Sequence, residues 1–92
     1  MTEQQSLQSI SMMLSTDAEA ALRQIEVHRG SFGESAEAYE LEGKAHLKRS
    51  DWRKAQNAFL KSNGLRPDGS ARQYLDMLAD IMAFYNKDMF NQ

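Results

Sequence analysis

Apolar residues recur three and four positions apart along most of the chain, and this spacing predicts α-helices. The first segment shows the pattern plainly, because Leu7, Ile10, Met13 and Leu14 share one helical face. No alternating run of apolar and polar residues flanks a hairpin-type turn, so no strand is expected. The pattern predicts an all-α chain of five helices, over about residues 3–14, 16–30, 36–49, 52–64 and 71–86.

Polar residues that can cap a helix stand just before several of these segments. Thr16 precedes Glu19 by three residues, which is a capping-box pattern at the start of the second helix. Ser70 and Gln73 repeat this pattern before the last helix. Ser50 and Asp51 are expected to break the chain and cap the fourth helix, because their side-chain oxygens can accept from free backbone amides of the first turn.

Glycine and proline mark where two of the helices should end. Gly30 begins the turn-rich stretch GSFGES and is expected to end the second helix. Gly64 is expected to end the fourth helix in the same way. Pro67, the only proline of the chain, prevents that helix from continuing.

The stretch 39–67 carries four residues whose spacing predicts a closely packed helix pair. Two antiparallel helices approach closely only where small side chains meet, and Gly43 and Ala55 supply such points. Phe59, one turn after Ala55, is expected to fill the space beside this crossing. Pro67 lies just past the second helix, so the chain turns there into the next helix.

This arrangement of glycine, alanine, phenylalanine and proline resembles the tetratricopeptide repeat (TPR), whose period is ~34 residues. In the family pattern, Tyr39 stands at the usual tryptophan, His46 at the usual tyrosine and Ser62 at a usual alanine. Leu41 lies one residue before the expected leucine, so Glu42 occupies a position that is normally apolar. By this resemblance the chain is identified as a small, bacterial-type TPR-like protein.

The pattern also recurs along the chain at the period of the repeat. A step back of ~34 residues pairs residues of similar size or role: Asp51 with Asp17, Ala55 with Ala21, Phe59 with Ile25, Gly64 with Gly30 and Gly43 with Ser9. A step forward places the last helix where the first helix of a third repeat would lie. We therefore expect a single TPR-like domain over residues 1–92, with a degenerate repeat at 1–33, a clear repeat at 36–69, a closing helix at 70–86 and a tail at 87–92.

The resemblance implies a right-handed superhelical stack of antiparallel helix pairs, with about two and a half TPR-like repeats. It also implies a protein-interaction scaffold. The concave groove of such a stack is lined by the first helix of each pair and holds an extended or helical peptide of a protein partner. The expected peptide-binding groove residues are Ser6, Ile10, Met13, Glu40, Lys44, Leu47, Lys48, Tyr74 and Leu78.

Part of this expected groove carries positive charge. Lys44 and Lys48 lie one turn apart, and Tyr74 is expected to face them from the closing helix. Together they predict a basic, partly aromatic wall that suits an acidic or C-terminal peptide segment. Glu40, one turn before Lys44, reduces that charge, so binding is expected to be weak and salt-sensitive.

The C-terminal tail is rich in large apolar side chains. Tyr85, Met89 and Phe90 lie in the stretch FYNKDMFNQ. A free apolar tail would associate non-specifically, so these residues are expected to fold back on the stack.

The residue types and their spacing indicate neither catalysis nor a cofactor. The absence of cysteine excludes disulfides, thiolate zinc sites and cysteine nucleophiles. His28 and His46 lack the spacing of a helical zinc pair, so no metal site is expected. We expect His46 to replace a packed aromatic side chain and His28 to lie near a helix end. Without a phosphate loop, a nucleotide fingerprint or a serine–histidine–aspartate order, the chain is not expected to be an enzyme.

The sequence gives no indication of a membrane protein. Its N-terminal stretch MTEQQSLQSISMML has no basic residue before the apolar part, and no apolar run approaches the length of a membrane span. A cytoplasmic location without a membrane partner is therefore expected.

Charge is distributed unevenly, and this leaves two alternatives open. Residues 1–42 hold eight acidic and two basic side chains, whereas residues 43–92 hold five acidic and nine basic ones. Solvated helix faces account for this split, but it also suits head-to-tail contact, so a self-associating structural module is the alternative function. The basic residues around Trp52 could hold a nucleic acid, although the net charge of −2 disfavours that partner.

Overall fold

The computed structural model describes residues 1–90, with side chains described as far as residue 85. Over this part of the chain the protein is entirely helical and contains no strand, as the apolar spacing predicts. The helices are α1 (Glu3–Leu14), α2 (Ala18–Phe32), α3 (Ala36–Lys48), α4 (Trp52–Leu65) and α5 (Ala71–Phe90).

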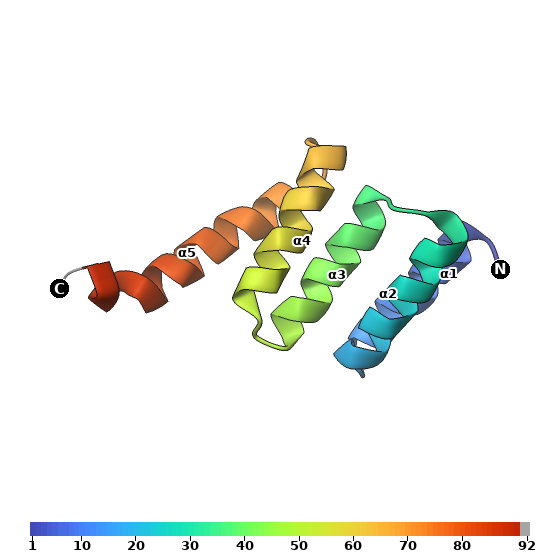
Figure 1. The fold of residues 1–92 in the computed structure, drawn as a ribbon, viewed down its shortest axis with the longest axis horizontal. Coiled ribbons are helices and arrows are strands. Elements are labelled where there is room, and N and C mark those ends of the chain that lie inside the picture. Colours follow the sequence, from blue (N-terminus) through green and yellow to red (C-terminus); the bar gives the residue numbers. More distant parts are fainter. Residues whose placement is uncertain (91–92) are drawn as a thin grey trace.

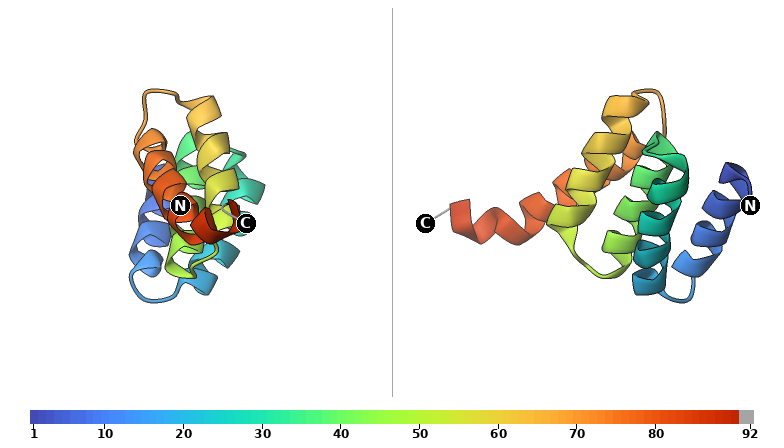
Figure 2. Two further views of the ribbon diagram at one scale, coloured as in Figure 1. Left: turned by 90° about the vertical axis from the view of Figure 1, so that its left-hand side faces the viewer. Right: turned by 45° about the vertical axis from the view of Figure 1, so that its right-hand side comes forward.

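The helices lie side by side in the order of the chain, and successive helices run in opposite directions (Figure 1). Helix α3 is central, because it contacts α1, α2 and α4. Helix α5 packs against α4 and then continues away from the body of the molecule (Figures 1 and 2). The molecule is consequently elongated, with extents of 53 × 28 × 18 Å.

Two apolar clusters hold these helices together. The N-terminal cluster joins α1 and α2 to α3, and its buried members are Ile10, Leu14, Ala21, Ile25, Leu41 and Ala45. The C-terminal cluster joins α4 to α5, and its buried members are Ala55, Phe59, Ala71 and Leu78. Burial of these side chains supplies the main driving force for packing the helices.

The close crossing predicted for α3 and α4 is present, and it centres on Gly43 and Phe59. A Cβ atom on Gly43 would lie 2.6 Å from two ring carbons of Phe59, so only glycine leaves room for the ring. The ring is completely buried, and its other side stacks on Tyr74 at 4.7 Å between centroids. Phe59 therefore links α3, α4 and α5, while Ala55, one turn earlier, is also fully buried.

The helix starts differ from prediction in the identity of two caps. Asp17, rather than Thr16, caps α2 and accepts from the backbone N–H of Ala20. A capping box does occur, but at α1, between Thr2 and Gln5. Asp51 caps α4 as predicted. At the start of α5, the backbone N–H of Gln73 donates to the carbonyl oxygen of Ser70. The Ser70 hydroxyl, which was expected to cap this helix, donates to Glu40 instead.

The helix ends differ from prediction as well. Gly30 does not end α2, which continues to Phe32 and stops at Gly33. With φ at 81°, Gly33 adopts a conformation that other residues rarely tolerate. Helix α4 ends at Leu65, one residue past Gly64.

The closing helix extends further than expected and takes in most of the predicted tail. It runs to Phe90 rather than to residue 86. Tyr85 does not fold back on the stack and is 65% exposed. The expectation for the side chains of Met89 and Phe90 lies outside the described residues.

Candidate functional site

A cleft of about 670 Å³ opens between α1 and α3. One face of α1 forms its first wall, and the N-terminal half of α3 forms the second. The C-terminal end of α4 contributes a single arginine. The lining residues are Glu3, Gln4, Leu7, Gln8, Ser11, Ser35, Glu37, Glu40, Leu41 and Arg66.

The floor of this cleft is apolar and its rim is polar. Leu7 is half-buried against the N-terminal cluster, of which Leu41 is a buried member. On the rim, Glu37 pairs with Arg66 across the α3–α4 pair. Glu40 accepts from the Ser70 hydroxyl and lies 3.4 Å from the Lys44 ammonium. The cleft thus offers a small apolar surface bordered by charged side chains that are held in place by their partners.

Of the groove residues predicted on α1, Ile10 is contradicted by its burial, and neither Ser6 nor Met13 lines the cleft. Ile10 is 1% exposed and belongs to the N-terminal cluster. Met13 is half-buried and packs against the same cluster. Ser6 faces α2, where its hydroxyl lies 2.7 Å from His28 Nδ1. The face that lines the cleft is instead the one that carries Leu7 and Gln8.

The predicted groove residues of α3 and α5 are only partly brought together. Glu40 lines the cleft, as predicted. Lys44 lies with its ammonium 5.4 Å from the centre of the Tyr74 ring, which confirms the predicted pairing of these residues, but neither lines the cleft. Leu47 packs against the C-terminal cluster. Lys48 is exposed on the last turn of α3.

Two features of the expected groove are therefore corrected. Leu78 is completely buried in the C-terminal cluster and cannot line a groove. The cleft is lined by the carboxylates of Glu3, Glu37 and Glu40 and by the guanidinium of Arg66, rather than by lysines. The missed residues on α1 carry a signal in the sequence, because polar Gln4, Gln8 and Ser11 surround Leu7 at helical spacing.

Comparisons with known proteins place the chain in a family. No protein-family model and no curated protein matches it. It is similar to a solved structure, the solution NMR structure of Bacteroides fragilis protein BF1650, with 40% sequence identity and a TM-score of 0.80. The similarity covers 94% of this chain and 89% of BF1650. This chain belongs to the BF1650 family. The all-helical fold is thus shared with an experimentally determined structure.

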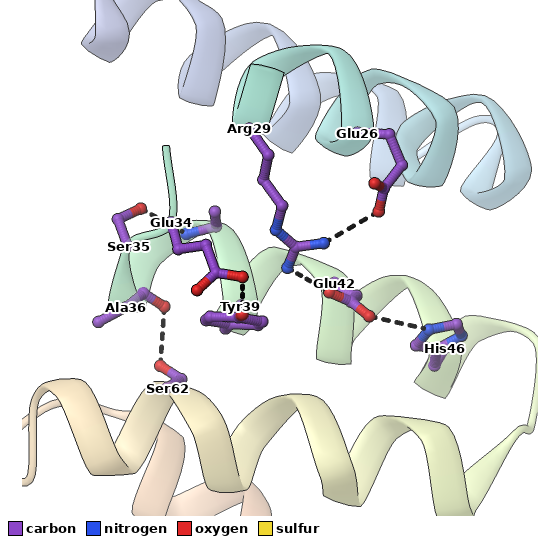
Figure 3. A network of polar contacts seen from close by, with 10 residues as sticks. Glu26, Arg29, Glu34, Ser35, Ala36, Tyr39, Glu42, His46 and Ser62 are labelled. Carbon is purple, nitrogen blue, oxygen red and sulfur yellow. Dashed lines mark hydrogen bonds and ion pairs between the residues drawn. The ribbon is translucent and has the colours of Figure 1, made fainter. Parts of the chain in front are cut away.

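In this member of the BF1650 family, a polar network joins α2 to α3 on another side of α3 (Figure 3). Arg29 donates to Glu26 at 3.0 Å and also to Glu42, while its guanidinium lies 4.4 Å from the centre of the Tyr39 ring. Burial lowers the pKa of Arg29, but the hydrogen bond and charge of Glu42, together with the charges of Glu26 and Tyr39, raise it above its ordinary value. Glu42 also faces His46 Nε2 at 3.6 Å. The carboxylate of Glu42 is therefore paired on two sides.

Tyr39 occupies the middle of this network in the BF1650-family chain. Its phenol donates to Glu34, and the Lys61 ammonium lies 5.4 Å from the ring centre. The hydrogen bond to Glu34, followed by burial and the charge of that carboxylate, raises the pKa of Tyr39 above its ordinary value of 10.0. The neutral phenol is thus the form that the fold favours.

This shift gives a prediction about alkaline pH. A raised pKa in the folded state means that the unfolded chain ionises first, so the contribution of Tyr39 to stability is present below pH 10.0 and is lost as the pH rises through the folded-state value. We expect the wild type to lose stability relative to Tyr39→Phe across this range. Urea unfolding of both proteins below and above pH 10.0 measures the difference. A constant difference at all pH values contradicts the prediction.

The two histidines of this BF1650-family protein are both buried and lie apart. His28 lies one turn before the end of α2, as expected, but it is only 1% exposed, and its ring contacts Phe32 at 5.0 Å between centroids. His46 is 8% exposed and packs where an aromatic side chain was expected. Among the described residues, no group of three or more histidine, aspartate or glutamate side chains could hold a metal ion.

Within the described part of the chain, no helix is both long enough and apolar enough to cross a membrane.

Proposed function

We propose that this protein is a non-catalytic interaction module that binds a peptide segment of another protein in the cleft between α1 and α3. The observation that carries the proposal is the cleft itself, which has a volume of about 670 Å³ and a floor formed by Leu7 and Leu41. A shallow apolar floor with polar groups at its rim is the usual composition of a peptide-binding groove. Glu37 and Glu40 are held by Arg66, Lys44 and Ser70, so they act as fixed polar contacts.

The order of the helices supports a right-handed, TPR-like superhelical stack of about two and a half repeats. The first helices of successive pairs begin at Glu3, Ala36 and Ala71, and the second helices begin at Ala18 and Trp52. These starts agree with a period of about 34 residues. In such a stack α1 and α3 are the first helices of their pairs, and the cleft between them corresponds to the concave groove.

Equivalent positions one period apart also perform equivalent tasks, which supports the repeat. Asp17 and Asp51 both cap a second helix by accepting from a backbone N–H three residues on. Ile25 and Phe59 are both completely buried. Residues one period apart therefore agree in their packing as well as in their spacing.

The charge of the cleft indicates which peptide it would take. Three carboxylates and one guanidinium line it, so neutral or basic side chains are favoured over acidic ones. Leu7 and Leu41 would contact an apolar side chain of the same segment. The partner that fits is a peptide with an apolar residue next to a lysine or arginine.

The test of this proposal is a blocked cleft compared with a matched surface change. Gln8 is exposed and lines the cleft, so Gln8→Arg would fill it with a long side chain that can pair with the nearby carboxylates. Gln24→Arg makes the same change at an exposed position of α2 outside the cleft. A partner captured by the wild type from native lysate and then purified is expected to bind Gln8→Arg at least about tenfold more weakly.

The control, Gln24→Arg, should bind the partner as tightly as the wild type does. Both variants should be as helical as the wild type by circular dichroism. Equal affinity of the wild type and Gln8→Arg for the partner would contradict binding in the cleft. Isothermal titration calorimetry gives the affinities.

Self-association is a second candidate, and exposed apolar side chains favour it. Leu60 and Leu65 on α4 are 52% and 58% exposed, and Phe84 on α5 is 75% exposed. Light scattering on a size-exclusion column at low and high salt distinguishes the candidates, because contact between the acidic and basic halves would weaken as salt increases.

A further inference from the structure

A second cleft lies where the turn between α3 and α4 meets α5. It has a volume of about 410 Å³, and the residues that matter for its chemistry are Arg49, Asp51, Trp52, Arg53, Met82 and Tyr85. This cleft follows the C-terminal end of α3, whereas the cleft between α1 and α3 is formed by the N-terminal half of that helix. The two surfaces share no lining residue.

The local structure fixes the aromatic walls of this second cleft. Ser50 adopts a φ of 59° in the turn, and Asp51 then caps α4 by accepting from the backbone N–H of Lys54. Trp52 is the first residue of α4 and packs, half-buried, against the C-terminal cluster. The indole is thereby held on one side while it lines the cleft on the other.

Helix α5 completes the cleft because it continues past the first turn of α4 (Figure 1). This continuation places Met82 and Tyr85 opposite the turn. Phe84 packs edge-on against Tyr85, at 5.6 Å between ring centroids and an angle of 87°.

The charge at the rim is basic. Arg53 is exposed on the first turn of α4, and Arg49 is 44% exposed and lies 3.3 Å from Glu19. The carboxylate of Asp51 caps the helix and lies 3.8 Å from the Lys54 ammonium, so its charge is largely compensated. An acidic group that approaches the cleft would meet the two guanidinium groups at its edge.

We propose that this cleft is a second docking site, which receives an aromatic or large aliphatic side chain of a peptide flanked by aspartate or glutamate residues. Tryptophan, tyrosine, methionine and arginine are the residue types enriched at the centres of protein interfaces, and all four meet here. The apolar walls would take the anchoring side chain, and Arg53 and Arg49 would contact the acidic flanks.

A peptide fits these residues better than a nucleic acid does. The net charge of −2 supplies no long-range attraction for a polyanion. A single acidic peptide needs only the local contacts with the two arginines.

With two separate clefts of different charge, the protein would be able to bridge two partners. The charged side chains of the first cleft are three carboxylates and one guanidinium, whereas the second cleft has arginines at its rim. Each would favour a peptide of opposite charge. The second site does not depend on the first, and each can be tested alone.

The chain offers a direct optical probe, because Trp52 is its only tryptophan. The experiment titrates the full-length protein with a short synthetic peptide that has a central phenylalanine between glutamates. A control peptide carries lysines in place of the glutamates. We expect the glutamate peptide to change the fluorescence of Trp52 saturably, and the lysine peptide to bind at least about tenfold more weakly.

The matched variants are Arg53→Glu and Arg23→Glu, which reverse the charge of two exposed arginines. Arg53→Glu is expected to weaken binding of the glutamate peptide by about tenfold or more, because it removes one attractive charge and adds a repulsive one. Its fold should be retained, since an acidic residue in the first turn of α4 is compatible with the helix dipole. Arg23→Glu, on α2, should bind this peptide as the wild type does.

Four results would overturn the proposal. The first two are the absence of any saturable response to the glutamate peptide, and equal responses to both peptides. The third is tighter binding of a single-stranded oligonucleotide than of the glutamate peptide. The fourth is a change in Trp52 fluorescence with protein concentration alone. The last result would mean that a second copy of the chain occupies the cleft.

Discussion

Replacing Phe59 with alanine is expected to lower the free energy of unfolding by about 3–5 kcal/mol. The side chain is completely buried, and it is the contact shared by α3, α4 and α5. Alanine would leave a cavity bounded by Gly43, which has no side chain to fill it, and by Tyr74, which would lose its stacking partner. Urea unfolding followed by circular dichroism measures the loss.

A matched control lies on α5. Phe84 is 75% exposed, so Phe84→Ala removes the same atoms from a site that is mostly in water, and its effect should be within about 0.5 kcal/mol. The stability loss of Phe59→Leu should lie between those of Phe59→Ala and Phe84→Ala, because leucine refills part of the cavity. Similar losses for Phe59→Ala and Phe84→Ala would mean that burial of Phe59 does not hold the three helices together.

The parts of the fold that the sequence predicts well are those set by contacts within one helix or between neighbouring helices. Apolar spacing places all five helices, because an amphipathic helix must turn one face to a core wherever that core lies. Gly43, Ala55 and Phe59 are predicted to lie at one crossing because small residues let two helices approach and a large one fills the space beside them, and the structure places Phe59 directly against Gly43. Such local complementarity can be recognised without knowing the rest of the fold.

Helix boundaries are harder to predict, because several residues compete for the same role. Thr16 and Asp17 are adjacent and both can cap a helix, and the aspartate does so. Gly30 meets no other atom at its Cβ position and is simply accommodated in the last turn of α2. Gly33, the glycine with a positive φ, is the residue that ends the helix.

The candidate site could not be predicted in detail, because its lining depends on how α1 is rotated between two neighbours. Helix α1 contacts both α2 and α3. The apolar stripe of α1 is wide enough to suit several orientations, and the structure buries Ile10 and Leu14 while leaving Leu7 at the cleft. The polar network could not be predicted for a similar reason, because Glu42 pairs with Arg29, which lies on a different helix.

The replacement of Gly43 by alanine is expected to destabilise the protein by about 1–3 kcal/mol, although alanine is the better helix former. In an open helix this exchange would stabilise by about 1 kcal/mol. Here the added methyl carbon would lie 2.6 Å from the ring of Phe59, so the ring or the helix must move. The ring is completely buried and stacked on Tyr74, which leaves it no space to turn aside.

Gly30→Ala provides a control with the opposite sign. Gly30 also lies within a helix, but nothing is within 4 Å of its Cβ position, so alanine should stabilise by up to about 1 kcal/mol. A further variant tests the cause of the loss at Gly43. If the clash with the ring is responsible, Gly43→Ala should cost less when it is combined with Phe59→Leu than it costs alone, because the smaller side chain makes room for the methyl group. Two results would contradict the close crossing of α3 and α4. One is that the stability losses of Gly43→Ala and Phe59→Leu simply add in the double variant. The other is that Gly43→Ala stabilises the protein, because the two helices could then separate at this point without cost.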